Sequence, residues 1–87
     1  MKMIIAILKD DDIDNVMQPL MAANFRVTRV ASTGGFFRKG STTLLIGVDD
    51  DRVDAAIQLL REHTSPPASG EKRAIVFVVP VNRFEQI

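Results

Sequence analysis

A short apolar run followed at once by an acidic cluster occurs twice in this chain, forty residues apart. The first run is residues 4–8 with acids at 10–12, and the second is residues 44–48 with acids at 49–51. Short apolar runs that end at polar clusters are typical of buried strands. The repeat therefore predicts that both halves of the chain begin with a strand that leads into a helix with an acidic start.

Each half continues with helical spacing and closes with a second apolar stretch. The helical positions are Ile13, Met17 and Leu20 in the first half and Val53, Ile57 and Leu60 in the second. Intervals of three and four residues place each set on one face of a helix. The closing stretches are residues 25–30 and 74–79. This order, βαβ followed by βαβ, predicts the α+β class and a ferredoxin-like sandwich, in which two helices cover one face of an antiparallel four-stranded sheet.

Length and composition exclude several classes of protein. At 87 residues and 46% hydrophobic content, the chain fits a single domain over residues 1–87 and is too short for a multidomain enzyme. With no Cys and one His it offers no disulfide framework and no zinc cluster, so we expect neither a metal nor a cofactor. Its 11 basic and 11 acidic residues give no net attraction to nucleic acid or membrane. No apolar run reaches the roughly 18 residues of a membrane span, and we expect a cytoplasmic protein.

The acids at both helix starts are interpreted as caps. An Asp side chain there can accept hydrogen bonds from free backbone N–H groups and meets the positive end of the helix dipole. The alternation of Asp10, Asp12 and Asp14 also occurs in calcium loops. A calcium loop needs Gly at its sixth position and Glu at its twelfth, where this chain has Asn15 and Met21, so calcium binding is excluded.

The last strand suggests an oligomer. Residues 74–79 are apolar at every position, which predicts burial on both faces of the strand, whereas a two-layer sandwich covers only one. The same surface of another subunit is the simplest cover, so we expect a symmetric oligomer. Residues 80–87 continue with spaced apolar side chains that could fold over a neighbouring surface.

The segment 26–43 holds most of the residues that could bind a ligand. Adjacent glycines at 34 and 35 allow consecutive N–H groups to bind phosphate oxygens, and Arg26, Arg38 and Lys39 could neutralise them. Phe36 and Phe37 could stack on a base, so the segment points to a nucleotide. The alternative is a simple turn with its Phe side chains at a subunit contact. A P-loop is excluded because Ser41 occupies the position of the essential Lys and a strand follows.

Catalysis finds little support in the sequence. Hydrolytic chemistry needs a nucleophile beside an oriented base, and His63, which is the only imidazole, lies at the end of the second helical segment. A His at that place is better explained as a partner of the helix dipole. We therefore expect a binding protein and not an enzyme.

Three motifs together resemble the PII-like cyclic-di-AMP receptor family of bacterial signal transduction proteins. They are Thr-Gly-Gly-Phe at 33–36, Ile-Gly-Val-Asp-Asp-Asp-Arg-Val-Asp at 46–54 and Ala-Ile-Val-Phe-Val-Val-Pro-Val at 74–81. The resemblance covers nearly the whole chain. It implies a ferredoxin-like subunit, a homotrimer with nucleotide sites in the clefts between subunits, and an unidentified target protein.

The resemblance also implies a set of ligand-binding residues. They are Arg26, Thr28, Gly35, Phe36, Phe37, Ser41, Gly47, Gly70, Phe77 and Gln86. Within this set, Arg26 and Thr28 would meet phosphate, sugar and base edges, and Gly47 would allow close backbone approach. The chain departs from the family at Ser41, where Asn is usual, and in its short loop at 64–72. These departures leave open another adenine nucleotide, such as ATP, or a module that only docks a protein.

Overall fold

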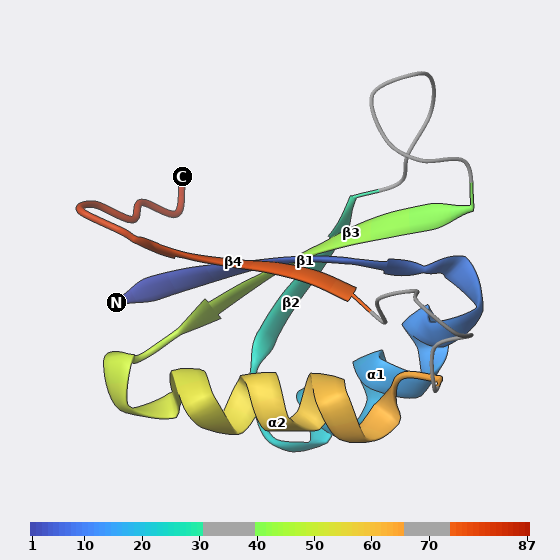
Figure 1. Ribbon diagram of the computed structural model, residues 1–87. Coiled ribbons are helices and arrows are strands. Elements are labelled where there is room, and N and C mark those ends of the chain that lie inside the picture. The colour runs from blue at the N-terminus through green and yellow to red at the C-terminus, as the bar shows by residue number, and fades with distance from the viewer. Residues whose placement is uncertain (31–39, 66–73) are drawn as a thin grey trace.

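Residues 1–30, 40–65 and 74–87 are described by the computed structural model, and they follow the order that the repeat predicts. The elements are β1 (Lys2–Lys9), α1 (Asp10–Ala22), β2 (Arg26–Val30), β3 (Ser41–Val48), the 3-10 turn η1 (Asp50–Arg52), α2 (Val53–His63) and β4 (Ala74–Pro80). The strands form one antiparallel sheet in the order β2-β3-β1-β4, and both helices lie on the same face of it (Figure 1). The predicted α+β, ferredoxin-like architecture is confirmed.

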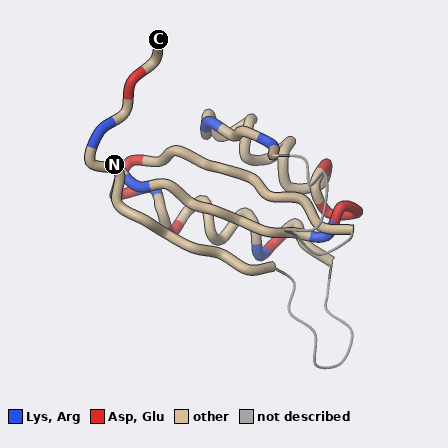
Figure 2. Tube along the Cα trace, turned by 90° about the horizontal axis from the view of Figure 1, so that it is seen from above, with Lys and Arg blue, Asp and Glu red and all other residues tan. Residues whose placement is uncertain are grey.

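The two copies of the apolar run form the centre of the sheet. β1 pairs with β3 so that Ile4 lies opposite Ile46 and Ala6 opposite Leu44. Few charged residues lie along the strands (Figure 2). The core side chains on the helix-covered face are Ile4, Ala6, Leu8, Leu44, Ile46 and Val48 of the strands, Ile13, Val16 and Leu20 of α1, and Ala56 and Leu60 of α2. The periodic positions predicted for both helices therefore face this core, with Met17, Val53 and Ile57 partly buried against it.

The interpretation of the helix-start acids as side-chain caps is wrong. The residues at the N-cap positions are Lys9 in α1 and Arg52 in α2, and neither helix start has a side-chain cap. Asp10, Asp11 and Asp12 lie in the first turn of α1, beyond the position from which a side chain caps. They still lie at the positive end of the helix dipole.

Two of these acids connect distant parts of the chain instead. The carboxylate of Asp10 accepts a hydrogen bond from the Thr42 hydroxyl of β3. Asp12 is 1% exposed, and its Oδ1 accepts from the backbone N of Ser65 at 3.2 Å and from its Oγ at 2.5 Å. Asp12 thus ties the start of α1 to the segment that follows α2.

The sheet face that the helices do not cover is the open face. On β4, Ile75 and Phe77 point to this face and are 45% and 53% exposed within the subunit. Val76 and Ala74 pack against the core on the other side. Val78 on that side is 41% exposed, so within the described part of the chain β4 is covered on one face only in part. The cover of its open face by another subunit stays a prediction. None of the described helices is long and apolar enough to span a membrane.

Candidate functional site

One end of the open face combines polar and small side chains with apolar ones. Arg26 of β2 lies opposite Gly47 of β3, Gly47 lies opposite Met3 of β1, and Met3 lies opposite Val79 of β4. The alternation of side chains along a strand places these four residues in one row across the sheet. The next row begins with Thr28 on β2. The guanidinium of Arg26 and the hydroxyl of Thr28 thus come from the same edge strand.

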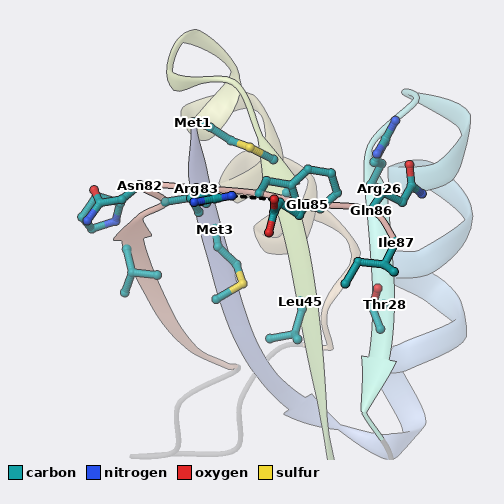
Figure 3. Close-up of a pocket in the computed structure, with 15 residues that line it drawn as sticks. Met1, Met3, Arg26, Thr28, Leu45, Asn82, Arg83, Glu85, Gln86 and Ile87 are labelled. Carbon is teal, nitrogen blue, oxygen red and sulfur yellow. Dashed lines mark hydrogen bonds and ion pairs between the residues drawn. The ribbon is translucent and has the colours of Figure 1, made fainter.

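Residues 81–87, the tail, follow β4 and return toward the opposite edge of the sheet. The backbone N of Val81 donates to Met1 O at 3.1 Å. Farther along, the ring centroid of Phe84 lies 6.0 Å from Cζ of Arg26 on β2. Arg83 and Glu85 form an exposed ion pair at 2.7 Å, which is of a kind that contributes little stability. Figure 3 shows Gln86 and Ile87 on the same side as Arg26 and Thr28.

The tail and this end of the sheet line a cavity of about 880 Å³, which is named the larger cavity because a smaller one adjoins it. Its polar and small lining residues include Arg26, Thr28, Gly47 and Gln86. Its apolar lining comes from Met1, Met3, Leu45, Val79, Pro80, Val81, Phe84 and Ile87. A cation, a hydroxyl and an amide beside apolar walls are suited to a ligand that carries phosphate, sugar and base.

The backbone at Gly47 is closely approached from the N-terminus. A Cβ atom built at Gly47 would lie 3.3 Å from Cε of Met1, which is tighter than an ordinary contact. A side chain at this position would thus take space from the cavity beside Arg26. The Cβ of such a side chain would also require the flexible end of the Met1 side chain to shift.

A second, smaller cavity of about 380 Å³ adjoins the first. The two share Met1, Arg26, Gly47 and Phe84 in their linings. The smaller cavity adds Asn24, Phe25, Val48, Asp49 and Arg52. Arg52 forms part of the wall of this cavity, and its Nη2 donates a hydrogen bond to Ala23 O at 3.0 Å.

The N-terminal amino group is fixed near both cavities. The nitrogen of Met1 lies 3.0 Å from Oδ1 of Asp50. The hydrogen bond from this amino group and its positive charge lower the pKa of Asp50, against an opposing effect of desolvation, and the charge of Lys2 lowers it slightly further. Because Met1 lines both cavities, this ion pair positions one of their walls.

The structure brings together four of the residues in the predicted ligand set. Arg26, Thr28, Gly47 and Gln86 line the larger cavity of a single chain. Ser41 lies at the other end of β3, opposite Lys9 and six residues from Gly47, or about 20 Å along the strand. Phe77 lies on the open face, where it pairs with Ile5 of β1, and it is not among the described residues that line the cavity. Gly35, Phe36, Phe37 and Gly70 lie outside the described residues.

Sequence reasoning missed Phe84, Met1 and Met3 as parts of the site. Alternation along a strand would place Met3 on the face opposite to Ile4, but its position opposite Gly47 is known only from the pairing of β1 and β3. The predicted tail that folds over a surface is present, but that surface is the sheet of the same chain. Among the described residues, no group of His, Asp and Glu could hold a metal ion.

Comparisons with known proteins place these features in context. The family model described as "Cyclic-di-AMP receptor" matches residues 1–69, a span that runs from β1 through α2 and includes Arg26, Thr28 and Gly47. The fold is also similar to the crystal structure of a functionally unknown protein from Pediococcus pentosaceus ATCC 25745. That similarity has a TM-score of 0.80 and 28% sequence identity, and it covers 99% of this chain and 96% of the other.

Proposed function

Because the chain belongs to the PII-like cyclic-di-AMP receptor family, we propose that it is a cytoplasmic bacterial signal transduction protein that binds cyclic-di-AMP between the subunits of a homotrimer. The observation that carries this proposal is the family match over residues 1–69. The larger cavity supports it independently, because the matched residues Arg26, Thr28 and Gly47 line one site.

Each of these residues has a suitable chemical role. Arg26 offers a planar, always charged group that can bind a phosphodiester through two N–H groups. Thr28 can donate to a phosphate or ribose oxygen, and the amide of Gln86 can both donate to and accept from a base edge. Gly47 has no side chain, so a ligand can approach the backbone closely there. These roles describe binding, and His63 lies exposed at the end of α2, so we propose a receptor and not an enzyme.

The open face supports the proposed trimer. Ile75 and Phe77 on β4 are large apolar side chains that the subunit leaves about half exposed. Contiguous exposed apolar side chains mark interaction surfaces, and most soluble oligomers are symmetric. In a trimer with ligands at its interfaces, Phe77 and Ser41 would serve the ligand of an adjacent subunit, since both lie away from the cavity of their own chain.

A second candidate is another adenine nucleotide, such as ATP. It is favoured by Ser41, whose hydroxyl is shorter than the amide usual in the family and offers fewer hydrogen bonds to a base. Arg26, Thr28 and Gly47 would bind the phosphate and sugar of either ligand. A protein-docking role without a nucleotide is the remaining outcome.

The test is calorimetric titration of the protein with cyclic-di-AMP, cyclic-di-GMP and ATP, with the oligomeric mass measured by sedimentation on the same sample. We expect a trimer that binds one cyclic-di-AMP per subunit. Arg26→Ala should weaken binding by about tenfold or more, because a hydrogen bond to a charged group contributes about 1.5–3 kcal/mol. Arg29→Ala, at an exposed arginine of the same strand that faces the other side, is the matched control. Saturable binding of ATP alone would favour the second candidate, and a trimer that binds neither would contradict both.

A further inference from the structure

Phe84 occupies an unusual place for a large apolar side chain. It is 55% exposed, although it lies on a tail that is packed near the sheet. It lines both the larger and the smaller cavity, together with Met1, Arg26 and Gly47. A half-exposed ring at the junction of two cavities contributes little to the core of the subunit, and the cavities that it lines are the space in which a ligand would lie.

The neighbour of Phe84 determines what kind of ligand could use that surface. The ring centroid lies 6.0 Å from Cζ of Arg26, at the outer limit of a cation–π contact. In a nucleotide, a sugar separates the phosphate from the base, so a phosphate held by Arg26 would place its base a few ångströms away. Phe84 is the aromatic ring that the two described cavity linings place beside Arg26 on the open face.

We propose that Phe84 is the stacking surface for a base of the nucleotide whose phosphate Arg26 binds. This inference rests on the proposed function and adds a residue to its site that lies outside the span matched by the family model. Stacking on an aromatic side chain contributes about 1–3 kcal/mol per base, and every base offers a face for it. Phe84 should therefore raise the affinity for nucleotides in general and leave the choice between adenine and guanine to other groups.

The position of the ring depends on few contacts. Within the described residues, the tail is joined to the sheet by the hydrogen bond from Val81 N to Met1 O, three residues before Phe84. The ring can thus adjust to a base without disturbing β4. Since Phe84 is half exposed, its replacement should leave the fold intact.

The test compares Phe84→Leu, which keeps an apolar side chain but removes the ring, with Phe84→Tyr, which keeps the ring. Met21→Ala serves as the control, because Met21 is 60% exposed on α1 and outside both described cavity linings. Each protein is titrated with cyclic-di-AMP, cyclic-di-GMP, ATP and ribose 5-phosphate, the last of which carries phosphate and sugar without a base. We expect Phe84→Leu to weaken nucleotide binding by roughly five- to 150-fold and to leave ribose 5-phosphate binding unchanged. Phe84→Tyr and Met21→Ala should bind as the wild type does.

A direct readout avoids reliance on the variants. In the wild-type protein with labelled phenylalanine, nuclear Overhauser effects should connect one ring to the base protons of the bound nucleotide. The signal is assigned to Phe84 by its absence in Phe84→Leu.

The remaining outcomes separate the two proposals. Equal loss of nucleotide and ribose 5-phosphate binding in Phe84→Leu would mean that the ring only positions Arg26, and tighter nucleotide binding would mean that Phe84 occupies the place of the ligand. Either result, or unchanged nucleotide binding, overturns the stacking role while the receptor function stands. If the wild type binds ATP but not cyclic-di-AMP, and Phe84→Leu weakens the binding of ATP, the stacking role stands and ATP replaces cyclic-di-AMP as the proposed ligand. If no nucleotide binds the wild type, both proposals are overturned.

Discussion

Arg52 stacks on Phe25, with Cζ of the guanidinium 4.1 Å from the centre of the ring. Arg52 ends the 3-10 turn between β3 and α2, whereas Phe25 precedes β2 and is 6% exposed. The same guanidinium donates to Ala23 O at 3.0 Å. The Arg52 side chain thus links the segment between β3 and α2 to the segment between α1 and β2, at the wall of the smaller cavity.

Arg52→Ala should lower the free energy of unfolding by about 1–2 kcal/mol. A cation–π contact near the surface contributes about 0.5–1 kcal/mol, and a hydrogen bond contributes about as much. Arg52→Lys should lie between the wild type and Arg52→Ala, because it keeps the charge but loses the planar stack. Urea unfolding at one protein concentration measures the difference. Arg29→Ala is the matched arginine control, and an equal effect of the two alanine variants would contradict a special role for the stack.

Asp12 and Ser65 should be coupled energetically. Asp12→Ala removes a buried acceptor of two hydrogen bonds and should cost about 1–3 kcal/mol, since each hydrogen bond contributes about 0.5–1.5 kcal/mol. Ser65→Ala removes only the hydroxyl and should cost less. A double-mutant cycle followed by urea unfolding is expected to give a coupling of at least 0.5 kcal/mol, on the scale of about 0.5–3 kcal/mol typical of contacting residues. Additive effects would show that the hydrogen bond from the Ser65 hydroxyl to Asp12 carries no stability.

Gly47→Ala should separate binding from stability. The new Cβ would meet only the flexible end of Met1, so the change in unfolding free energy should stay within about 1 kcal/mol. The affinity for the nucleotide should fall, because the methyl group enters the cavity beside Arg26. Calorimetric titration and urea unfolding of the same preparation test both parts. A variant that is stable and binds as tightly as the wild type would remove Gly47 from the site.

The ion pair between Met1 and Asp50 should appear in a pH titration. Its effect is to lower the pKa of Asp50 in the folded protein below the unfolded value of about 3.9. The resulting stabilisation is present above the unfolded pKa and is lost as the pH falls through the folded one. Nuclear magnetic resonance of the Asp50 carboxyl carbon should give a lower midpoint in buffer than in concentrated urea. Acetylation of the amino group should raise the folded midpoint, and an unchanged midpoint would assign the shift to Lys2 instead.

Phe77→Asp should dissociate the proposed trimer without unfolding the subunit. Phe77 is 53% exposed in the subunit, so a carboxylate there meets water in the monomer but would be buried at an interface. Sedimentation should show a lower mass, and circular dichroism should show an unchanged fold. A variant that keeps the wild-type mass would place the subunit contacts elsewhere.

Local sequence patterns predicted the fold because the apolar runs and the helical spacing are clear in this chain. Ile4 belongs to the first apolar run and Leu20 to the helical spacing that follows it, and the structure buries both. The role of Asp12 could not be predicted, because its partner Ser65 lies 53 positions away and only the packing of the helices brings the two together. The same limit applies to Phe84, whose neighbour Arg26 lies on the opposite edge strand of the sheet.

The two edge strands differ in their chemistry. The exposed residues of β2 include Arg26, Thr28 and Arg29, whereas those of β4 include Ile75 and Phe77. The subunit therefore has a direction, from a polar edge to an apolar one. When subunits with a direction contact one another in the same sense, unlike surfaces meet at every contact, and the assembly is a closed ring or an open chain. In a closed ring the number of junctions equals the number of subunits, so every ligand site at a junction would receive residues from both neighbouring subunits.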